Sequence, residues 1–115
     1  MQTLSTEQVQ DIRKQDGKTP LINVLPEEAF EKAHIPGTRN IPVGSDDFVS
    51  RVEKEAGGKE QPVVVYCANK ECDASPKAAK QLEDAGFKHV FDYEGGTEAW
   101  KQAGLDIEGK ESAAA

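Results

Sequence analysis

The stretch that decides the fold is VVVYCANKECDASP, residues 63–76. Val63 to Tyr66 are consecutive strand formers with no polar interruption, which is typical of a strand covered on both faces. Ser75 is a favourable helix N-cap and Pro76 suits the first helical position, so a helix is predicted to begin there. The polar loop between them therefore joins the end of a buried strand to the start of a helix.

Cys67 is the first residue of that loop. A helix N-terminus offers unpaired backbone N–H groups and a partial positive charge. Successive N–H groups of such a loop can also point inward and form an anion-binding nest. Both effects stabilise a thiolate, so we expect Cys67 to ionise more readily than a free cysteine and to act as a nucleophile.

Three reactions suit a thiolate in this position. They are attack on a sulfane sulfur to give a persulfide, attack on phosphate or arsenate, and disulfide formation between Cys67 and Cys72 of the same loop. Phosphoryl transfer favours an arginine that binds the equatorial oxygens in bidentate fashion. The loop contains no arginine; its only cation is Lys70, and Glu71 and Asp73 oppose an anionic transition state. Phosphate and arsenate chemistry are therefore disfavoured.

Apolar strands and amphipathic helices alternate along the chain. Besides the strand at 63–66, strands or extended segments are predicted at 21–25, 40–43 and 89–93, and helices at 5–14, 26–33, 45–56, 76–85 and 97–103. This alternation implies an α/β fold with a mainly parallel sheet and helices on both faces. Ligands of such sheets bind beyond the carboxyl ends of the strands, where Cys67 is expected to lie.

Size and charge restrict the function classes. The chain of 115 residues is predicted to form one domain over residues 1–110, followed by a frayed tail at 111–115. A net charge of −7 without a basic cluster argues against nucleic acid and anionic membranes as partners. The sequence has no apolar run long enough to span a bilayer and no recognisable signal peptide, so we expect a cytoplasmic protein.

The cysteines and histidines do not suggest a metal site. Two cysteines are too few for a disulfide framework, and both lie in one loop. His34 and His89 are distant from them in sequence and form no ligand pattern with them. We therefore expect two thiols that serve chemistry rather than a structural zinc site.

Several blocks of the chain, in their order and spacing, resemble the rhodanese-like, single-domain sulfurtransferase family. They are LINVLPEEAF at 21–30, HIPG at 34–37 with NIP at 40–42, VVVYC at 63–67, SPKAA at 75–79, and GG at 95–96 with AW at 99–100. Together they cover nearly the whole chain. The resemblance implies a three-layer sandwich in which a five-stranded, mainly parallel sheet has helices on both sides.

The resemblance also implies a reaction. Cys67 would take a sulfane sulfur from a small anionic donor such as thiosulfate, or from a persulfide, and pass it to cyanide or a thiol; the thiol acceptor could belong to a protein. No metal or organic cofactor is needed. The persulfide would lie in a cradle formed by the residues that follow Cys67 in the loop: Ala68, Asn69, Lys70, Glu71, Cys72, Asp73, Ala74 and Ser75.

Three features depart from the family's usual pattern. Asn23-Val24-Leu25 stands where the family usually has Asp-Val-Arg, the loop is longer than usual, and it contains Cys72. Cys72 is a candidate resolving thiol that would attack a Cys67 persulfide or sulfenate and close a disulfide; the alternative is a loop residue without a role. A longer loop with paired cysteines resembles a subgroup of the family. The departures leave a second hypothesis open, namely a non-catalytic or redox-regulated rhodanese-like binding module that uses Cys67 and Cys72.

Overall fold

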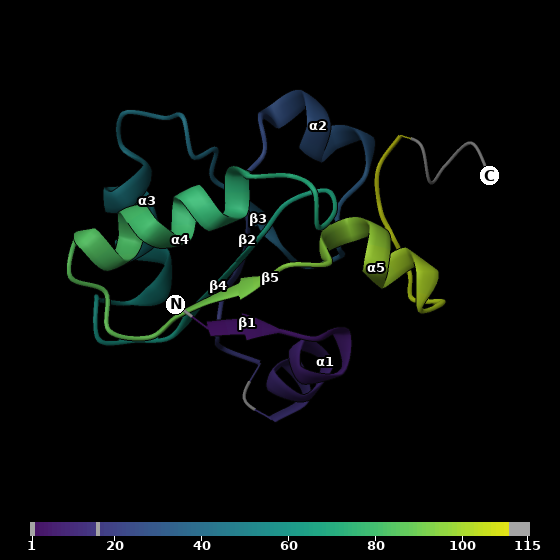
Figure 1. The fold of residues 1–115 in the computed structure, drawn as a ribbon, viewed down its shortest axis with the longest axis horizontal. Helices are drawn as coiled ribbons and strands as arrows, with labels where there is room; N and C mark the ends of the chain where they lie inside the picture. The colour runs from purple at the N-terminus through teal and green to yellow at the C-terminus, as the bar shows by residue number, and fades with distance from the viewer. Residues whose placement is uncertain (1, 16, 111–115) are drawn as a thin grey trace.

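The structure is a computed structural model that describes residues 2–15 and 17–110. Within these residues, a sheet of five parallel strands in the order β1-β5-β4-β2-β3 forms the centre of the molecule (Figure 1). The strands are β1 (Gln2–Leu4), β2 (Leu21–Asn23), β3 (Arg39–Asn40), β4 (Val63–Tyr66) and β5 (Val90–Tyr93). The predicted parallel α/β sheet is confirmed, whereas the frayed tail predicted at 111–115 lies outside the described residues.

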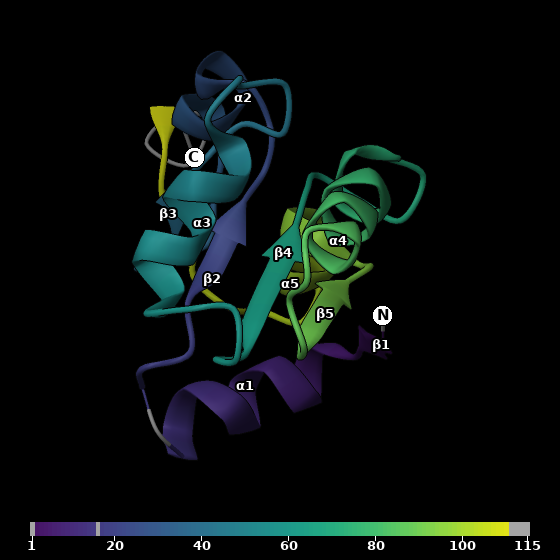
Figure 2. The same cartoon turned by 90° about the vertical axis from the view of Figure 1, so that its left-hand side faces the viewer.

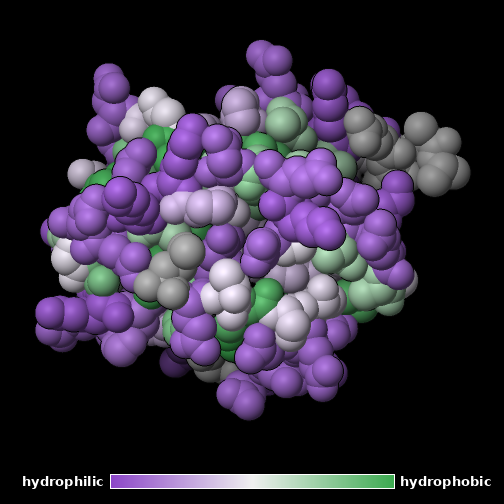
Figure 3. Space-filling view, in the orientation of Figure 1, coloured by the Kyte–Doolittle hydropathy of each residue, from purple (hydrophilic) through white to green (hydrophobic). Residues whose placement is uncertain are grey.

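Helices cover both faces of the sheet and confirm the three-layer arrangement (Figures 1 and 2). α3 and α4 enclose one core, and α1 and α5 enclose the other. No helix in the described part of the chain is long and apolar enough to cross a lipid bilayer. The surface seen in Figure 3 is mostly hydrophilic. The helices are α1 (Thr6–Gln15), α2 (Glu27–Lys32), α3 (Phe48–Ala56), α4 (Ala74–Asp84) and α5 (Gly96–Gln102).

The central strand β4 supplies side chains to both cores. Val63, Val65 and Cys67 belong to the core under α3 and α4. Val64 and Tyr66 belong to the core under α1 and α5. Successive side chains of a strand point to opposite faces, and both faces of β4 are covered, which explains its unbroken apolar sequence. The same alternation directs the Cys67 side chain toward α4.

One strand was not predicted. β1 has three residues and pairs with β5, with Leu4 opposite Tyr93. A segment this short shows no periodicity in sequence, and its extended shape depends on a partner almost ninety residues away. β2 and β3 are shorter than predicted and end at Asn23 and Asn40.

The prediction that Ser75 caps α4 is wrong. The helix begins at Ala74, and Asp73 occupies the N-cap position without a side-chain hydrogen bond to the helix. The Asp73 carboxylate instead forms an ion pair with Lys77 at 3.1 Å. Ser75 therefore lies within the first turn, and its side chain is 1 % exposed. Its hydroxyl faces the interior of the protein rather than the end of the helix.

The start of α5 packs directly on the end of β4. The N–H groups of Thr97 and Glu98 donate hydrogen bonds to the carbonyl oxygens of Cys67 and Ala68, at 3.1 Å and 2.9 Å. Gly96 has φ +61°, and a Cβ at this position would overlap the Cys67 carbonyl oxygen. Glycine permits both the backbone conformation and the close approach. The predicted cap residue Thr97 is thus a buried residue of the helix rather than its N-cap.

Replacing Gly96 by alanine should destabilise the protein more than replacing Gly104. Both glycines have positive φ, which costs an alanine about 1–2 kcal/mol. Space around Gly104 is open, so Gly104→Ala should lose only that amount. Gly96→Ala must also displace the Cys67 carbonyl and should lose roughly 3 kcal/mol or more. Urea unfolding of both proteins measures the difference, and equal losses would contradict the close approach.

Candidate active site

Oxygen atoms surround the sulfur of Cys67, whose side chain is fully buried. Its Sγ lies 3.5 Å from Oγ of Ser75 and 3.6 Å from the carbonyl oxygen of Cys72. A longer contact of 3.9 Å joins it to the carbonyl oxygen of Asn69. Carbonyl oxygens can only accept hydrogen bonds, so these contacts favour the neutral thiol as the donor.

Asn69 organises the loop. Its Oδ1 accepts the N–H groups of Glu71 at 3.0 Å and of Cys72 at 3.1 Å. Asparagine side chains commonly bond the backbone two or three residues further along in this way. These two N–H groups are therefore directed at Asn69 rather than at the sulfur. The expectation of an inward-facing nest of loop amides is wrong for Glu71 and Cys72.

Burial raises the pKa of the Cys67 thiol to about 11. The nearby Cys72 side chain raises the pKa further, whereas the hydroxyl and the N–H of Ser75 lower it. The prediction that Cys67 ionises more readily than a free cysteine is therefore wrong for this conformation. Removal of the thiol from water outweighs the favourable field at the start of α4.

Cys72 lies beside Cys67. Both cysteines are free thiols, and Cys72 is half-buried against the core that contains Cys67. Its side chain is close enough to influence the ionisation of Cys67. The structure thus brings together the two thiols that the sequence suggests as nucleophile and resolving thiol, although these roles stay predictions.

The remaining loop residues of the predicted cradle lie nearer the surface. Lys70 and Glu71 are exposed and, with Asn69, line a shallow cleft of about 350 Å³ against α5. Ala68 is half-buried, and Ala74 is the first residue of α4. The predicted cradle is therefore only partly assembled around the sulfur. Asn69, Cys72 and Ser75 contact it, whereas Lys70 and Glu71 lie at the surface.

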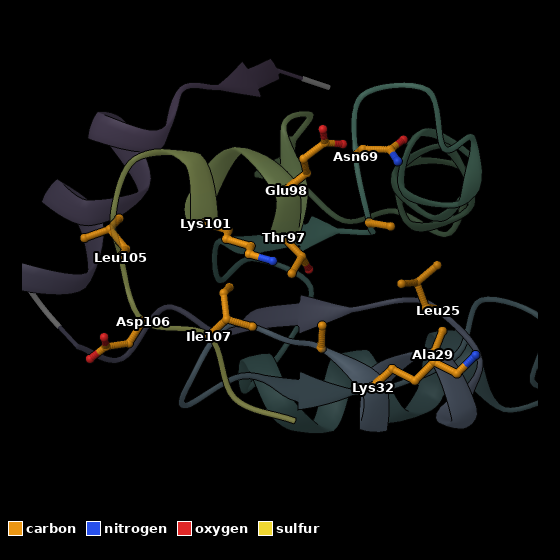
Figure 4. A pocket seen from close by; sticks show the side chains of 12 residues that line it. Leu25, Ala29, Lys32, Asn69, Thr97, Glu98, Lys101, Leu105, Asp106 and Ile107 are labelled. Carbon is orange, nitrogen blue, oxygen red and sulfur yellow. The ribbon is translucent and has the colours of Figure 1, made fainter. Parts of the chain in front are cut away.

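A larger cleft of about 630 Å³ opens beside the loop, beyond the carboxyl ends of β2 and β4 (Figure 4). Leu25, Ala29 and Ile107 contribute apolar surface. Lys32 of α2 and Lys101 of α5 lie on opposite walls and contribute positive charge. The volume is within the range of small-molecule sites, and the position is the usual one for ligands of parallel sheets.

The chain's C-terminal segment forms one wall of this cleft. Indole Nε1 of Trp100 donates to the Asp106 carbonyl at 3.1 Å. His34 and Glu108 form an antiparallel bridge with backbone bonds of 2.8 Å and 2.9 Å. These bonds hold Ile107 in the lining of the cleft.

Asn23 and Leu25 have distinct roles. Asn23 is fully buried, and its Oδ1 accepts the Leu25 N–H at 3.0 Å, an acceptor role that a carboxylate could also fill. Leu25 lines the cleft, so the family's usual arginine is replaced there by an apolar side chain. The charge of this wall is therefore lower than the family pattern implies.

Comparison with known proteins decides the family. The family model for the rhodanese-like domain matches residues 5–103. The chain belongs to the rhodanese-like domain family. The resemblance noted in the sequence is thereby confirmed.

Solved structures share the fold of this rhodanese-like domain. The rhodanese-like domain of the Alr3790 protein from Anabaena sp. is 26% identical, with a TM-score of 0.80 over 100% of this chain and 84% of that chain. Thiosulfate sulfurtransferase from Pseudomonas aeruginosa is 23% identical, with a TM-score of 0.78 over 95% of this chain and 20% of that one. The second likeness concerns the fold alone.

One relative with a similar sequence is a longer protein. The HTH-type transcriptional regulator Rv0324 from Mycobacterium tuberculosis is 31% identical over 96 residues. The match covers 84% of this rhodanese-like domain and 40% of the regulator. Domains of this kind therefore occur within proteins named for functions other than sulfur transfer.

Sequence reasoning missed one buried group of this rhodanese-like domain, Asp92. Its side chain is 1 % exposed on β5, and burial raises the pKa of its carboxyl. The signal in the sequence is an acidic residue within the apolar segment 89–93. Lys32 and Lys101 were also missed, because nothing local distinguishes them from other surface lysines. In residues 2–15 and 17–110, no three His, Cys, Asp or Glu side chains cluster as metal ligands would.

A variant with Cys67 as its only cysteine should react slowly with iodoacetamide at neutral pH. Burial is the largest cause of the raised pKa of Cys67 and remains in this variant, so the thiolate is scarce at pH 7. The Cys72→Ser protein, followed by mass spectrometry from pH 6 to pH 11, should show its main increase in rate above about pH 9. The same protein unfolded in urea should reach its full rate at lower pH. A full rate near neutral pH in the folded protein would contradict the effect of burial.

Proposed function

We propose that this rhodanese-like domain is a sulfurtransferase that carries a sulfane sulfur on Cys67. The observation that supports it is a fully buried cysteine at the end of β4, in contact with Ser75 in the first turn of α4. The hydroxyl and N–H of Ser75 favour negative charge on the sulfur. Membership of the rhodanese-like family adds independent support.

The transfer consists of two displacements at sulfur. The Cys67 thiolate attacks the outer sulfur of thiosulfate; a bond forms between the two sulfur atoms, the S–S bond of thiosulfate breaks, and sulfite leaves with the electron pair. Cyanide or a thiolate then attacks the terminal sulfur of the persulfide. Thiocyanate or a new persulfide leaves, and the Cys67 thiolate is restored.

The cleft beside the loop is suited to binding the donor and acceptor. Lys32 and Lys101 can attract a small anionic donor, and Leu25 and Ile107 can contact the apolar part of a larger thiol. Because Cys67 is fully buried, a donor must first displace the carbonyl groups that cover its sulfur. Outward movement of the loop after Ala68 is therefore part of the proposed reaction. A protein thiol is an acceptor of the same chemical class.

Incubation with thiosulfate should add one sulfur atom to Cys67, because the persulfide is the proposed intermediate. Mass spectrometry of the intact protein and of its peptides measures the gain. Cys67→Ser should gain no sulfur and should transfer none to cyanide above the uncatalysed background. The matched variant Cys72→Ser should still gain the sulfur at Cys67. The proposal fails if wild type gains no sulfur, or if Cys67→Ser transfers sulfur as wild type does.

A second candidate function is redox regulation through a Cys67–Cys72 disulfide. The observation that favours it is the position of Cys72, whose half-buried side chain packs against the core that contains Cys67. With a peroxide, Cys67 becomes a sulfenic acid and the Cys72 thiol displaces water to form the disulfide. On a Cys67 persulfide, the Cys72 thiolate attacks the Cys67 sulfur and hydrosulfide leaves.

Mild hydrogen peroxide should convert wild type to a monomer that has lost two hydrogen atoms, because Cys72 closes the disulfide within the loop. Cys72→Ser cannot close this bond and should accumulate oxygen adducts on Cys67 instead. Intact-mass measurement without reductant separates the two products. The same oxidation products in both proteins would rule out Cys72 as the resolving thiol.

A further inference from the structure

The large cleft beside the loop is lined in part by a buried hydroxyl group that lacks a partner. Thr97 is one of the lining residues, and only 8 % of it is exposed. Within residues 2–15 and 17–110, its Oγ1 forms no hydrogen bond. A buried hydroxyl without a partner is unfavourable, so natural proteins seldom keep one without a reason. A ligand that enters the cleft is a source of the missing partner.

Lys101 lies on the same face of α5 as Thr97. The two residues are four apart in the helix, so their side chains are neighbours one turn apart. Figure 4 shows both side chains directed into the cleft. The N–H groups of Thr97 and Glu98 are already bonded to the carbonyls of Cys67 and Ala68. The candidate site therefore consists of two side-chain groups, a hydroxyl and an ammonium group, rather than of a helix end.

The charged side chains that line the cleft do not all point into it. Lys32 and Lys101 form no ion pair with another described residue. Glu98 and Asp106 also line the cleft, but in Figure 4 their carboxylates point away from its centre. Glu98 accepts a hydrogen bond from Gln102 at 3.2 Å, an exposed contact along α5. The interior of the cleft therefore favours a negatively charged group.

Apolar side chains form most of the remaining lining, and the wall near α2 is held in place. The bridge between His34 and Glu108 fixes one side of this wall. Gly109 packs so closely on the backbone of Lys32 that a Cβ would lie 2.5 Å from the Lys32 carbonyl oxygen. A preformed apolar surface binds a hydrocarbon body at low entropic cost. The apolar lining residues are Leu25, Ala29, Ala33, Ala68, Leu105 and Ile107.

Asn69 connects the cleft with the sulfur of Cys67. Asn69 is a lining residue, and its carbonyl oxygen lies 3.9 Å from Sγ of Cys67. A molecule in the cleft thus lies against the loop segment that must move outward in the proposed reaction. The same movement would bring the Cys67 sulfur and the bound molecule together.

We propose that the cleft binds the sulfur acceptor, and that this acceptor is a small thiol whose apolar body carries a carboxylate. The inference rests on the proposed sulfurtransferase function. Lys101 and Thr97 hold the carboxylate, since an ammonium group and a hydroxyl match its single charge and its two accepting oxygens. Leu25 and Ile107 contact the apolar body.

The proposed site places the acceptor for the second displacement of the reaction. The acceptor thiolate attacks the outer sulfur of the Cys67 persulfide, and a new S–S bond forms to the acceptor. The S–S bond to Cys67 breaks, and Cys67 leaves as the thiolate with the electron pair. The acceptor departs as a persulfide that still carries its carboxylate.

Binding is tested without the reaction, by titrating hexanoate and hexanol into isotope-labelled protein at equal ionic strength and following amide signals by NMR. Hexanoate should shift the signals of the cleft residues and bind about threefold or more tightly than hexanol. Lys101→Gln and, separately, Thr97→Val should remove most of this preference. The matched control Lys54→Gln removes an exposed positive charge on α3, outside the lining of the cleft, and should keep the preference.

The Thr97 variants separate ligand binding from a structural role. Thr97→Val removes a hydroxyl that has no partner in the described chain, so its urea unfolding midpoint should equal or exceed that of wild type. Thr97→Ser keeps the hydroxyl and should retain the preference for hexanoate. A lower midpoint for Thr97→Val, with hexanoate binding unchanged, would overturn the role of this hydroxyl in the site.

The acceptor role is tested with ω-mercaptohexanoate and ω-mercaptohexanol, in which the carboxylate is too remote to change the thiol. With thiosulfate as donor, KM should be lower for the carboxylate, and Lys101→Gln should raise that KM about threefold or more with kcat little changed. Equal KM values for the two thiols in wild type would overturn the proposal. Sulfur gain at Cys67 without any preference for the carboxylate disproves this inference alone, whereas hexanoate binding in the cleft without sulfur gain disproves the sulfurtransferase alone.

Discussion

The attachment of α5 to the end of β4 is the constraint on which the site depends. Two N–H groups at the start of α5 hold the carbonyls of Cys67 and Ala68, and Gly96 allows the backbones to meet. With the carbonyl of Cys67 held on the α5 side, its side chain points to the opposite face and is buried beneath α4. The direction of the Cys67 backbone therefore determines the burial of its side chain. The contact between its Sγ and Ser75 follows from that direction.

Burial of the sulfur gives the domain a resting state that differs from a permanently ionised cysteine. Desolvation dominates the pKa of Cys67, and the first turn of α4 only partly offsets it. Asn69 meanwhile binds the loop amides that would otherwise be available to an anion. The same elements that define the site thus keep the thiol neutral and covered.

The sequence was informative wherever a property is local. β4 was predicted with its observed ends, since four buried strand formers are recognisable without knowledge of their partners. The position of Cys67 at the end of that strand followed directly. The predicted direction of the shift in the Cys67 pKa was wrong, because desolvation of the thiol depends on how α4 and the loop pack over the sulfur. Ser75 was misread as a cap because a serine before a proline fits that motif, although the helix begins at Ala74. Asp92 has no local motif, and its burial follows only when β5 is placed beside β4.

The large cleft also has a consequence for the order in which the domain can be completed. Its lining includes Leu25, which follows β2, and Ile107, whose segment is held by the bridge between His34 and Glu108. During synthesis, Cys67 leaves the ribosome well before Ile107 does, because chains emerge from their N-terminal end. A nascent chain can thus contain the complete cysteine loop while its cleft is still open on one side. The cleft is complete only after the segment that contains Ile107 has folded onto the end of α2.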